Sequence, residues 1–332
     1  MIPSHYLRKL SFLIALVSLV AIGCGESKQA EAVSTPVGET PEALPDDPFL
    51  VVLGTIQDAG SPQIGCNAAC CRDLFANPDP DRMRTSLGLI DPNSGRSYLF
   101  EATPDIGNQL HLLQKYSKLR SPLPDGIFLT HAHIGHYSGL QFLGKEAINA
   151  TETPVYGMPR MIQFLSENGP WEQLVTNKNI ELQPIMADST LVLSEDIAVT
   201  PLLVPHRDEY SETVGYLISG PQRTALFIPD IDKWDRWERS IVDLIKEVDI
   251  AFLDATFYHG EEIQIRDISQ IPHPFIEESM ELFQDLSTED RSKINFIHFN
   301  HTNPVLNLNS IQHQTVLQNG FSIAGLNDVT SL

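Results

Sequence analysis

From Phe49 onward, short apolar runs rich in β-branched and aromatic residues alternate with stretches that have apolar residues at helical spacing. The first pattern is typical of β-strands and the second of amphipathic helices. We predict strands over residues 49–56, 85–90, 97–102, 126–132, 214–219, 224–230, 250–255 and 294–299, and a hairpin or two strands over 191–206. We predict helices over residues 106–118, 138–149, 159–169, 235–248 and 275–286.

Strands occur in both halves of the chain, with helices between them. This order favours a mixed α/β fold in which sheets pack on each other with helices outside, rather than a single parallel sheet or an all-β sandwich. The hydrophobic content of 42% over 332 residues is ample for one sizeable core.

The first 24 residues are typical of an export signal. Arg8 and Lys9 precede the apolar stretch LSFLIALVSLVAIG, which is short for a spanning helix and ends directly before Cys24. The segment AIGC resembles the bacterial lipobox, in which cleavage before the cysteine allows its lipidation. We predict a signal peptide over residues 1–23 and lipidation at Cys24. A plain secretory signal and an ordinary membrane anchor are the alternatives.

Residues 24–48 are polar and rich in Pro, Ser, Thr and Glu, without hydrophobic periodicity. We therefore predict a flexible linker that holds a domain over residues 49–332 away from the membrane. The predicted location is the periplasmic side of the cell envelope. Gly25 after the lipidated cysteine, in place of an aspartate, favours the outer membrane.

The formal net charge is −21, from 22 Lys and Arg against 43 Asp and Glu. An acidic surface repels polyanions, which argues against a nucleic-acid partner. It is compatible with a small-molecule substrate held by a metal ion. We expect contact with the membrane through the lipid anchor.

Three cysteines, Cys66, Cys70 and Cys71, lie within six residues of one another. In an exported protein a disulfide is the usual expectation. Three is an odd number, however, and adjacent cysteines seldom reach disulfide geometry. A clustered metal site is therefore the favoured interpretation, and a disulfide stays the alternative.

Histidines and one aspartate gather at the ends of predicted strands. The segment THAHIGHYSG, which holds His131, His133 and His136, directly follows the strand GIFL. Histidines at this spacing converge when a strand ends in a tight turn, and imidazole nitrogen suits zinc and similar ions. His206 and Asp230 also end apolar runs, and each taken alone could be a plain strand-end or helix-capping residue.

The segment FIHFNHTNP also closes a predicted strand, and it contains His298 and His301. The chain resembles the metallo-β-lactamase superfamily over essentially residues 49–332. The histidines and the aspartate at its predicted strand ends occur in the same order as the metal ligands of that superfamily. The resemblance implies an αββα sandwich with one or two zinc ions at the sheet edge. The matching ligand positions are His131, His133, His136, His206, Asp230 and His298.

By this resemblance, the first metal is held by His131, His133 and His206. His136 and His298 hold the second metal, and Asp230 bridges the two metals. The metal lowers the pKa of a bound water molecule and so generates hydroxide near neutral pH.

Two branches of the superfamily are most similar: the pyrroloquinoline-quinone biosynthesis protein B group and the cyclic-phosphate phosphodiesterase of the carbon–phosphorus lyase pathway. The stretch 53–71 and the segment HTNP resemble motifs of the first branch. The second branch adds a structural zinc bound by a CxCxxC segment and a histidine three residues beyond the last active-site histidine. This resemblance implies a structural metal site formed by Cys66, Cys70, Cys71 and His301. Ala68 stands where the middle cysteine is expected, so either Cys70 or Cys71 can be a spectator.

His273, between two prolines, resembles a histidine that related phosphodiesterases, including tRNase Z, use near the leaving group. A protonated imidazole there can act as general acid, and an exposed turn histidine is the alternative. The strand-end carboxylates of Asp105 and Asp254 can either orient ligand histidines or cap helices.

Gly135 departs from the superfamily motif HxHxDH, because the sequence here is HAHIGH. Glycine offers no donor atom where the second metal normally finds a carboxylate. Three consequences are open: a mononuclear site, a position filled by water or substrate, or a loss of hydrolysis.

We predict a metal-dependent hydrolase that acts on a phosphodiester or other ester-like bond, with Asp230 and His273 as catalytic residues and zinc as the metal. The alternatives are an oxidative step in pyrroloquinoline quinone biosynthesis, with iron possible in the same ligand set, and a non-catalytic metal-binding lipoprotein. A true β-lactamase fits less well because of the cysteine cluster.

Overall fold

The computed structural model describes residues 44–117, 121–207, 209–262 and 272–332. The predicted signal peptide, Cys24 and nearly all of the linker therefore lie outside the described residues. Within the described ranges, no helix combines the length and the apolar character needed to cross a bilayer.

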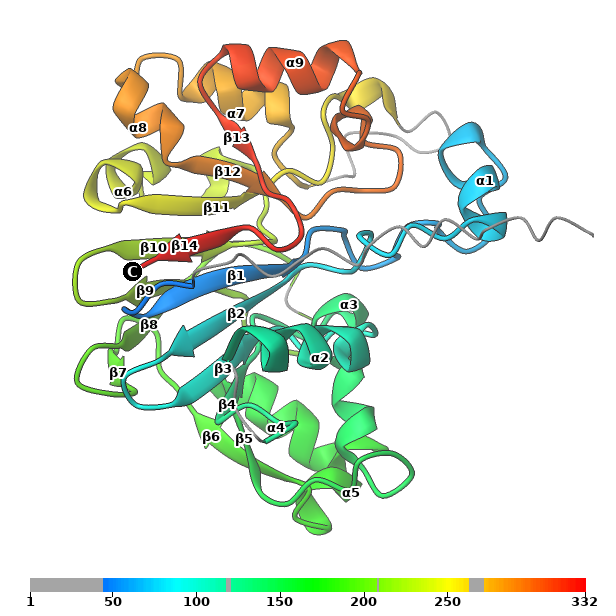
Figure 1. Cartoon of the computed structure of the whole chain (residues 1–332), viewed down its shortest axis with the longest axis vertical. Helices are drawn as coiled ribbons and strands as arrows, with labels where there is room; N and C mark the ends of the chain where they lie inside the picture. The colour runs from blue at the N-terminus through cyan, green and yellow to red at the C-terminus, as the bar shows by residue number, and fades with distance from the viewer. Residues whose placement is uncertain (1–43, 118–120, 208, 263–271) are drawn as a thin grey trace, which may run out of the picture. The chain divides into compact units, whose positions relative to one another are not determined.

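Two sheets, each of seven strands among the described residues, form the centre of this part of the chain (Figure 1). The first sheet has the order β14-β1-β2-β3-β4-β5-β6 and the second the order β13-β12-β11-β10-β9-β8-β7. The strands of the first sheet are β1 Phe49–Gly54, β2 Ser86–Asp91, β3 Arg96–Phe100, β4 Gly126–Phe128, β5 Thr153–Gly157, β6 Ile180–Pro184 and β14 Val329–Ser331. The strands of the second are β7 Leu191–Val192, β8 Ala198–Leu203, β9 Val214–Ser219, β10 Thr224–Ile228, β11 Ile250–Asp254, β12 Ile294–Ile297 and β13 Ser322–Ile323.

Helices cover the outer face of each sheet, as Figure 1 shows. The first sheet packs against α2 Ile106–Ser117, α4 Pro159–Glu167 and α5 Trp171–Thr176. The second packs against α6 Ile241–Glu247, α7 Ile276–Leu282 and α9 Ile311–Gln318. The remaining described helices are α1 Ala69–Ala76, α3 Ile134–Tyr137 and α8 Thr288–Ser292, with 3-10 turns η1 Ser138–Leu143, η2 Trp234–Arg236, η3 Gly260–Glu262 and η5 Pro304–Leu306. This layering confirms the predicted αββα fold.

The run FLVVLG of β1 shows why the strands are almost continuously apolar. Successive side chains of a strand point to opposite faces. Leu50 and Val52 belong to the core between the two sheets, whereas Val51 and Leu53 belong to the core under the helices. A strand with both faces buried has no polar face to alternate with.

Three of the predicted helices are clearly shorter than their sequence pattern indicates, and the helix predicted over 275–286 covers only Ile276–Leu282. Residues 138–149 form only the 3-10 turn η1 and a following loop, because Gly139 packs against the backbone of Thr103 and Ala102. Residues 235–248 form a helix only from Ile241, after the N-cap Ser240. Before it, the Trp237 indole donates a hydrogen bond to the Leu203 carbonyl at 2.7 Å, which holds that segment outside the helix.

The strand directions bring the predicted site residues to one edge of each sheet. In the first sheet β1, β3 and β4 run parallel to one another, because β2 is antiparallel to β1 and to β3 and because β3 pairs parallel with β4. In the second sheet β8, β10, β11 and β12 share a direction, since β9 is antiparallel to both β8 and β10. The loops that follow these strands therefore leave each sheet from a common edge.

Replacement of Phe128 by alanine tests the aromatic cluster between the sheets. The Phe128 ring is fully buried and stacks on Phe100 and Tyr156 with centroid distances of 4.9 and 4.4 Å. We expect Phe128→Ala to lower the free energy of unfolding by about 3–5 kcal/mol, measured by urea denaturation at fixed metal content. The matched control is Phe142→Ala, whose side chain is 46% exposed. An equal loss in both variants would contradict this description of the core.

Candidate metal centre

The loop after β4 folds the three neighbouring histidines toward one another. His133 has an extended backbone at the N-cap of α3, and His136 lies within that helix, so the chain turns sharply between them. The ring of His131 lies 4.3 Å, centroid to centroid, from each of the other two rings. The Ser211 hydroxyl fixes the turn by accepting a hydrogen bond from the Ala132 backbone N–H at 2.8 Å. The predicted convergence is present.

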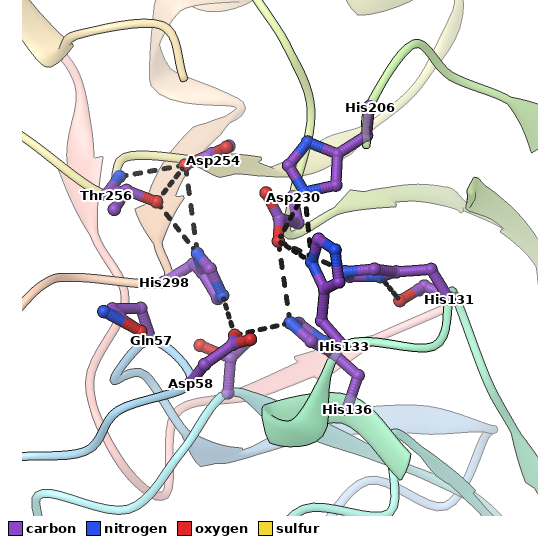
Figure 2. Close-up of polar contacts among 12 residues, drawn as sticks. Gln57, Asp58, His131, His133, His136, His206, Asp230, Asp254, Thr256 and His298 are labelled. Carbon is purple, nitrogen blue, oxygen red and sulfur yellow. Dashed lines mark hydrogen bonds and ion pairs between the residues drawn. The ribbon is translucent and has the colours of Figure 1, made fainter. Parts of the chain in front are cut away.

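Two further residues reach the same place from the second sheet, as Figure 2 shows. His206 follows β8, and its Nε2 lies 3.3 Å from His133 Nδ1 and 3.3 Å from Asp230 Oδ2. Asp230 follows β10 and is 3% exposed. His131 Nε2 lies 3.4 Å from the same carboxylate oxygen. One ligand atom from each of these four residues lies within 4.8 Å of the others.

A second group of possible ligands adjoins the first and shares Asp230 with it. It contains His136, His298 and Asp58, again with ligand atoms within 4.8 Å of one another. His136 and His298 were predicted, but Asp58 was not. The sequence feature that could have identified Asp58 is its position just after the buried strand β1, at the sheet edge where β3 and β4 also end.

The donor atoms of the first group fit a metal ion. His131 Nε2 is buried and has no hydrogen-bond partner among the described residues, although it faces the shared carboxylate. A buried polar atom without a partner is costly, and a cation at the centre of the group would supply one. Imidazole nitrogens with a carboxylate oxygen form a donor set suited to zinc and other borderline ions.

The titration behaviour of the group reflects its concentrated charge. Burial would raise the pKa of Asp230, but the imidazoles of His206 and His273 hold that pKa well below its usual range. Burial would lower the pKa of His206, but Asp230 and Asp232 raise it to about 9. Burial and the nearby charge of His136 lower the pKa of His131. The carboxylate thus attracts cations, and a bound metal ion would take the place of these protons.

Carboxylates and hydroxyls behind the histidines orient their rings. Glu101, fully buried after β3, has Oε1 3.4 Å from His136 Nδ1. Thr256 Oγ1 lies 2.9 Å from His298 Nδ1. Asp105, predicted as one possible orienting group, instead pairs with Arg84 at 3.0 Å, so that interpretation of Asp105 is wrong. Glu101 takes this place, because it lies at the end of β3 and its side chain points inward.

His273 lies beside the metal-ligand group rather than in an exposed turn. Its Nδ1 is 2.8 Å from Asp254 Oδ2 and 3.2 Å from Asp230 Oδ1, and its side chain is 13% exposed. Burial would lower the pKa of His273, but the two carboxylates raise it well above the ordinary value. Asp254 therefore orients His273, which was predicted as a proton donor rather than as a metal ligand, and its Oδ1 lies 4.0 Å from Nδ1 of the predicted ligand His298.

The cysteine cluster forms a separate candidate site with four possible ligands. Cys66, Cys70, Cys71 and His301 each place one ligand atom within 4.8 Å of the others. Two thiolates that bind one tetrahedral zinc ion at the usual zinc–sulfur distance of about 2.3 Å have sulfur atoms about 3.8 Å apart. The observed Sγ–Sγ distances are 3.8 Å for Cys66 with Cys70 and 3.9 Å for Cys70 with Cys71. The three described cysteines are free thiols, and both Cys70 and Cys71 face the site.

Residues 96–299 match the family model described as "Beta-lactamase superfamily domain". The chain belongs to this superfamily. The matched range contains the whole histidine and aspartate constellation except Asp58, which lies before it.

Known proteins of this superfamily resemble the chain over most of its length. Coenzyme PQQ synthesis protein B of Klebsiella pneumoniae is 26% identical over 301 residues, which cover 83% of this chain and 96% of that protein. Zn²⁺-bound PqqB from Methylobacterium extorquens has a TM-score of 0.69 at 22% identity, covering 86% of this chain and 100% of that one. A diphosphatase of the PhnP family has a TM-score of 0.57 at 20% identity, covering 85% and 96%. These solved structures share the fold, and members of the superfamily are often metallo-hydrolases.

Removal of two ligand histidines tests whether the constellation holds metal. We expect the purified wild-type chain to contain more than one metal ion and the double variant His131→Ala/His133→Ala to lose at least one. The physical reason is that both imidazoles belong to the first ligand group. Metal content per chain, measured by plasma emission spectrometry, checks this.

The matched control is His111→Ala, because His111 is an exposed histidine on α2. It should retain the wild-type metal content. Equal metal content in the wild type and the double variant would mean that the histidine constellation does not bind metal.

Proposed function

We propose that the protein is a metal-dependent hydrolase that cleaves a phosphodiester or another ester-like bond. The observation that carries this proposal is the position of Asp230, whose carboxylate belongs to both groups of metal ligands and to a third group with Asp254 and His273. A carboxylate shared between two metal positions and an adjacent proton donor is an arrangement suited to hydrolysis.

Zinc is the metal we propose, on the basis of the imidazole-rich donor set. His131, His133 and His206 would hold the first ion, and Asp230 would bridge to a second at His136 and His298. When bound, the metal lowers the pKa of a water molecule and polarises the scissile group.

We propose that His273 donates a proton to the leaving group. Its Nδ1 is held by Asp254 and Asp230, so the ring presents Nε2 on its opposite edge. The two carboxylates keep the imidazole protonated near neutral pH, which is the state that a general acid requires. Asp254 acts by orienting the ring and by stabilising its charge.

A cleft beside the metal centre supports a small substrate with little negative charge. Its volume is about 910 Å³, and the described residues that line it include Gln57, Cys66, Phe257, Glu262, Asn300 and His301 but no Lys or Arg. Gln57 directly precedes Asp58, and the Phe257 ring lies 6.1 Å from the ring of His273. Amide and aromatic groups suit a neutral or singly charged ester better than a polyphosphate, which basic residues usually bind.

Replacement of His273 by asparagine tests the proposed acid. We expect His273→Asn to lower kcat for an alkyl phosphodiester by about 10²–10⁴-fold, because the alkoxide leaving group then departs without a proton. Hydrolysis of bis(p-nitrophenyl) phosphate should change far less, because nitrophenolate is a good leaving group. Steady-state kinetics on the two substrates, at matched metal content, make the comparison.

His111→Asn is the control and should match the wild type on both substrates. A loss of equal size on both substrates would contradict a proton-donor role for His273. Absence of turnover by the metal-loaded wild type on phosphodiesters, carboxylic esters and a cephalosporin would contradict the hydrolase proposal.

A second candidate is a role in the synthesis of coenzyme PQQ, as an oxidative step with iron in the same ligand set. The similarity to coenzyme PQQ synthesis protein B across 96% of that protein favours it. The two candidates differ in their need for oxygen. Turnover that continues without dioxygen supports the hydrolase, whereas dioxygen uptake by the iron-loaded chain with a PQQ precursor supports the second candidate.

We further propose that the protein is exported and attached to the periplasmic side of the cell envelope through lipid on Cys24. The support is the positively charged, apolar signal that ends in AIGC. We expect the wild type to partition into the detergent phase of Triton X-114 and Cys24→Ser to move to the aqueous phase or to keep its uncleaved signal. Ser34→Ala, which changes the predicted linker and leaves the lipobox intact, is the control. A Cys24→Ser variant that is processed and partitions like the wild type would contradict lipidation.

A further inference from the structure

The space next to Gly135 is filled by another residue. A Cβ atom built on Gly135 would lie 2.5 Å from Asp58 Cα and 2.7 Å from both Asp58 Cγ and Oδ1. These distances are shorter than real Cβ contacts. A side chain at position 135 would therefore collide with the loop that carries Asp58. The sequence has glycine at this position, and the aspartate comes from a segment 77 residues earlier in the chain.

The Asp58 carboxylate points into the second ligand group, as Figure 2 shows. Its Oδ1 lies 2.8 Å from His136 Nε2 and 3.3 Å from His298 Nε2. These are the ring nitrogens left for a metal, because Glu101 lies behind His136 and Thr256 behind His298.

The backbone around Asp58 is held rigidly in this position. The Gln57 N–H donates to the Phe299 carbonyl at 3.0 Å, and the Ala59 N–H donates to Gln57 Oε1 at 2.7 Å. Arg84 donates from Nε to the Asp58 carbonyl at 2.7 Å. A ligand fixed in place before the metal arrives loses little conformational freedom on binding.

We propose that Asp58 is a ligand of the second metal ion, and that it supplies from the loop after β1 the carboxylate that Gly135 lacks. This assignment rests on the proposed metal centre and concerns the same site. It makes the second position a set of two imidazoles and two carboxylates: His136, His298, Asp230 and Asp58. Glycine at position 135 then serves to make room for Asp58.

The competing account is that Asp58 only forms an ion pair with a protonated His136 and keeps metal out of the second position. The two accounts predict different effects of an Asp58 substitution on the affinity for the second metal ion. A ligand lost by mutation weakens the second ion, whereas removal of an ion-pair partner leaves metal binding unchanged or strengthens it.

Cobalt(II) titration of the full-length chain in detergent separates these accounts, because thiolate-bound cobalt absorbs at different wavelengths from cobalt bound by nitrogen and oxygen. We expect the wild type to bind two ions in the histidine constellation. Asp58→Ala and Asp58→Asn should bind one tightly and the second with an affinity lower by at least ~10-fold. Asp81→Ala, which removes an exposed aspartate, is the control and should match the wild type.

Two outcomes would overturn the assignment, and they are distinguishable. If the wild type and both Asp58 variants bind two ions with equal affinity, Asp58 is not a ligand, and the metal centre itself stands. If the wild type binds no cobalt outside the cysteine cluster, the metal centre fails and the assignment fails with it. Circular dichroism of each variant checks that the fold is retained.

Discussion

The two halves of the metal centre come from different sheets, and a short backbone connection at the shared edge holds them together. Phe299 donates its N–H to the Thr55 carbonyl at 2.8 Å, and its own carbonyl accepts from the Gln57 N–H at 3.0 Å. These bonds continue the direction of β1 and β12 beyond the sheets. Together with the hydrogen bond from Arg84 to the Asp58 carbonyl, they place Asp58 next to His298.

The site concentrates buried charge and backbone strain that the rest of the fold must support. Asp230, Glu101 and Asp254 are at most 3% exposed, and such desolvation is costly unless each carboxylate has a cationic partner. Glu101 and His298 also have positive φ angles of 76° and 69°, a conformation that costs non-glycine residues about 1–3 kcal/mol. Glu101 directly follows β3 and His298 directly follows β12.

Much of the fold could be predicted because local pattern and global structure agree. The strand FLVVLG is apolar at every position, and the structure buries both of its faces. The helices predicted over 138–149 and 235–248 were too long because distant groups decide where they begin or end. Gly139 meets the backbone of Thr103, and Trp237 is bound by the Leu203 carbonyl, and neither contact is visible from helical spacing.

In the candidate site, too, some residues were identified from the sequence and others only from the tertiary structure. His131, His133 and His136 are neighbours in the chain, and their spacing marked them as candidates. His206, Asp230 and His298 end apolar strands, and the resemblance to the superfamily assigned them as ligands. The absence of a carboxylate at Gly135 is equally visible in the sequence. Only the tertiary structure decided that Asp58 occupies that space and that Glu101, rather than Asp105, stands behind His136. The reason is physical: which carboxylate reaches a given point depends on strand direction and loop path, and these arise from pairings between residues as far apart as Gln57 and Phe299.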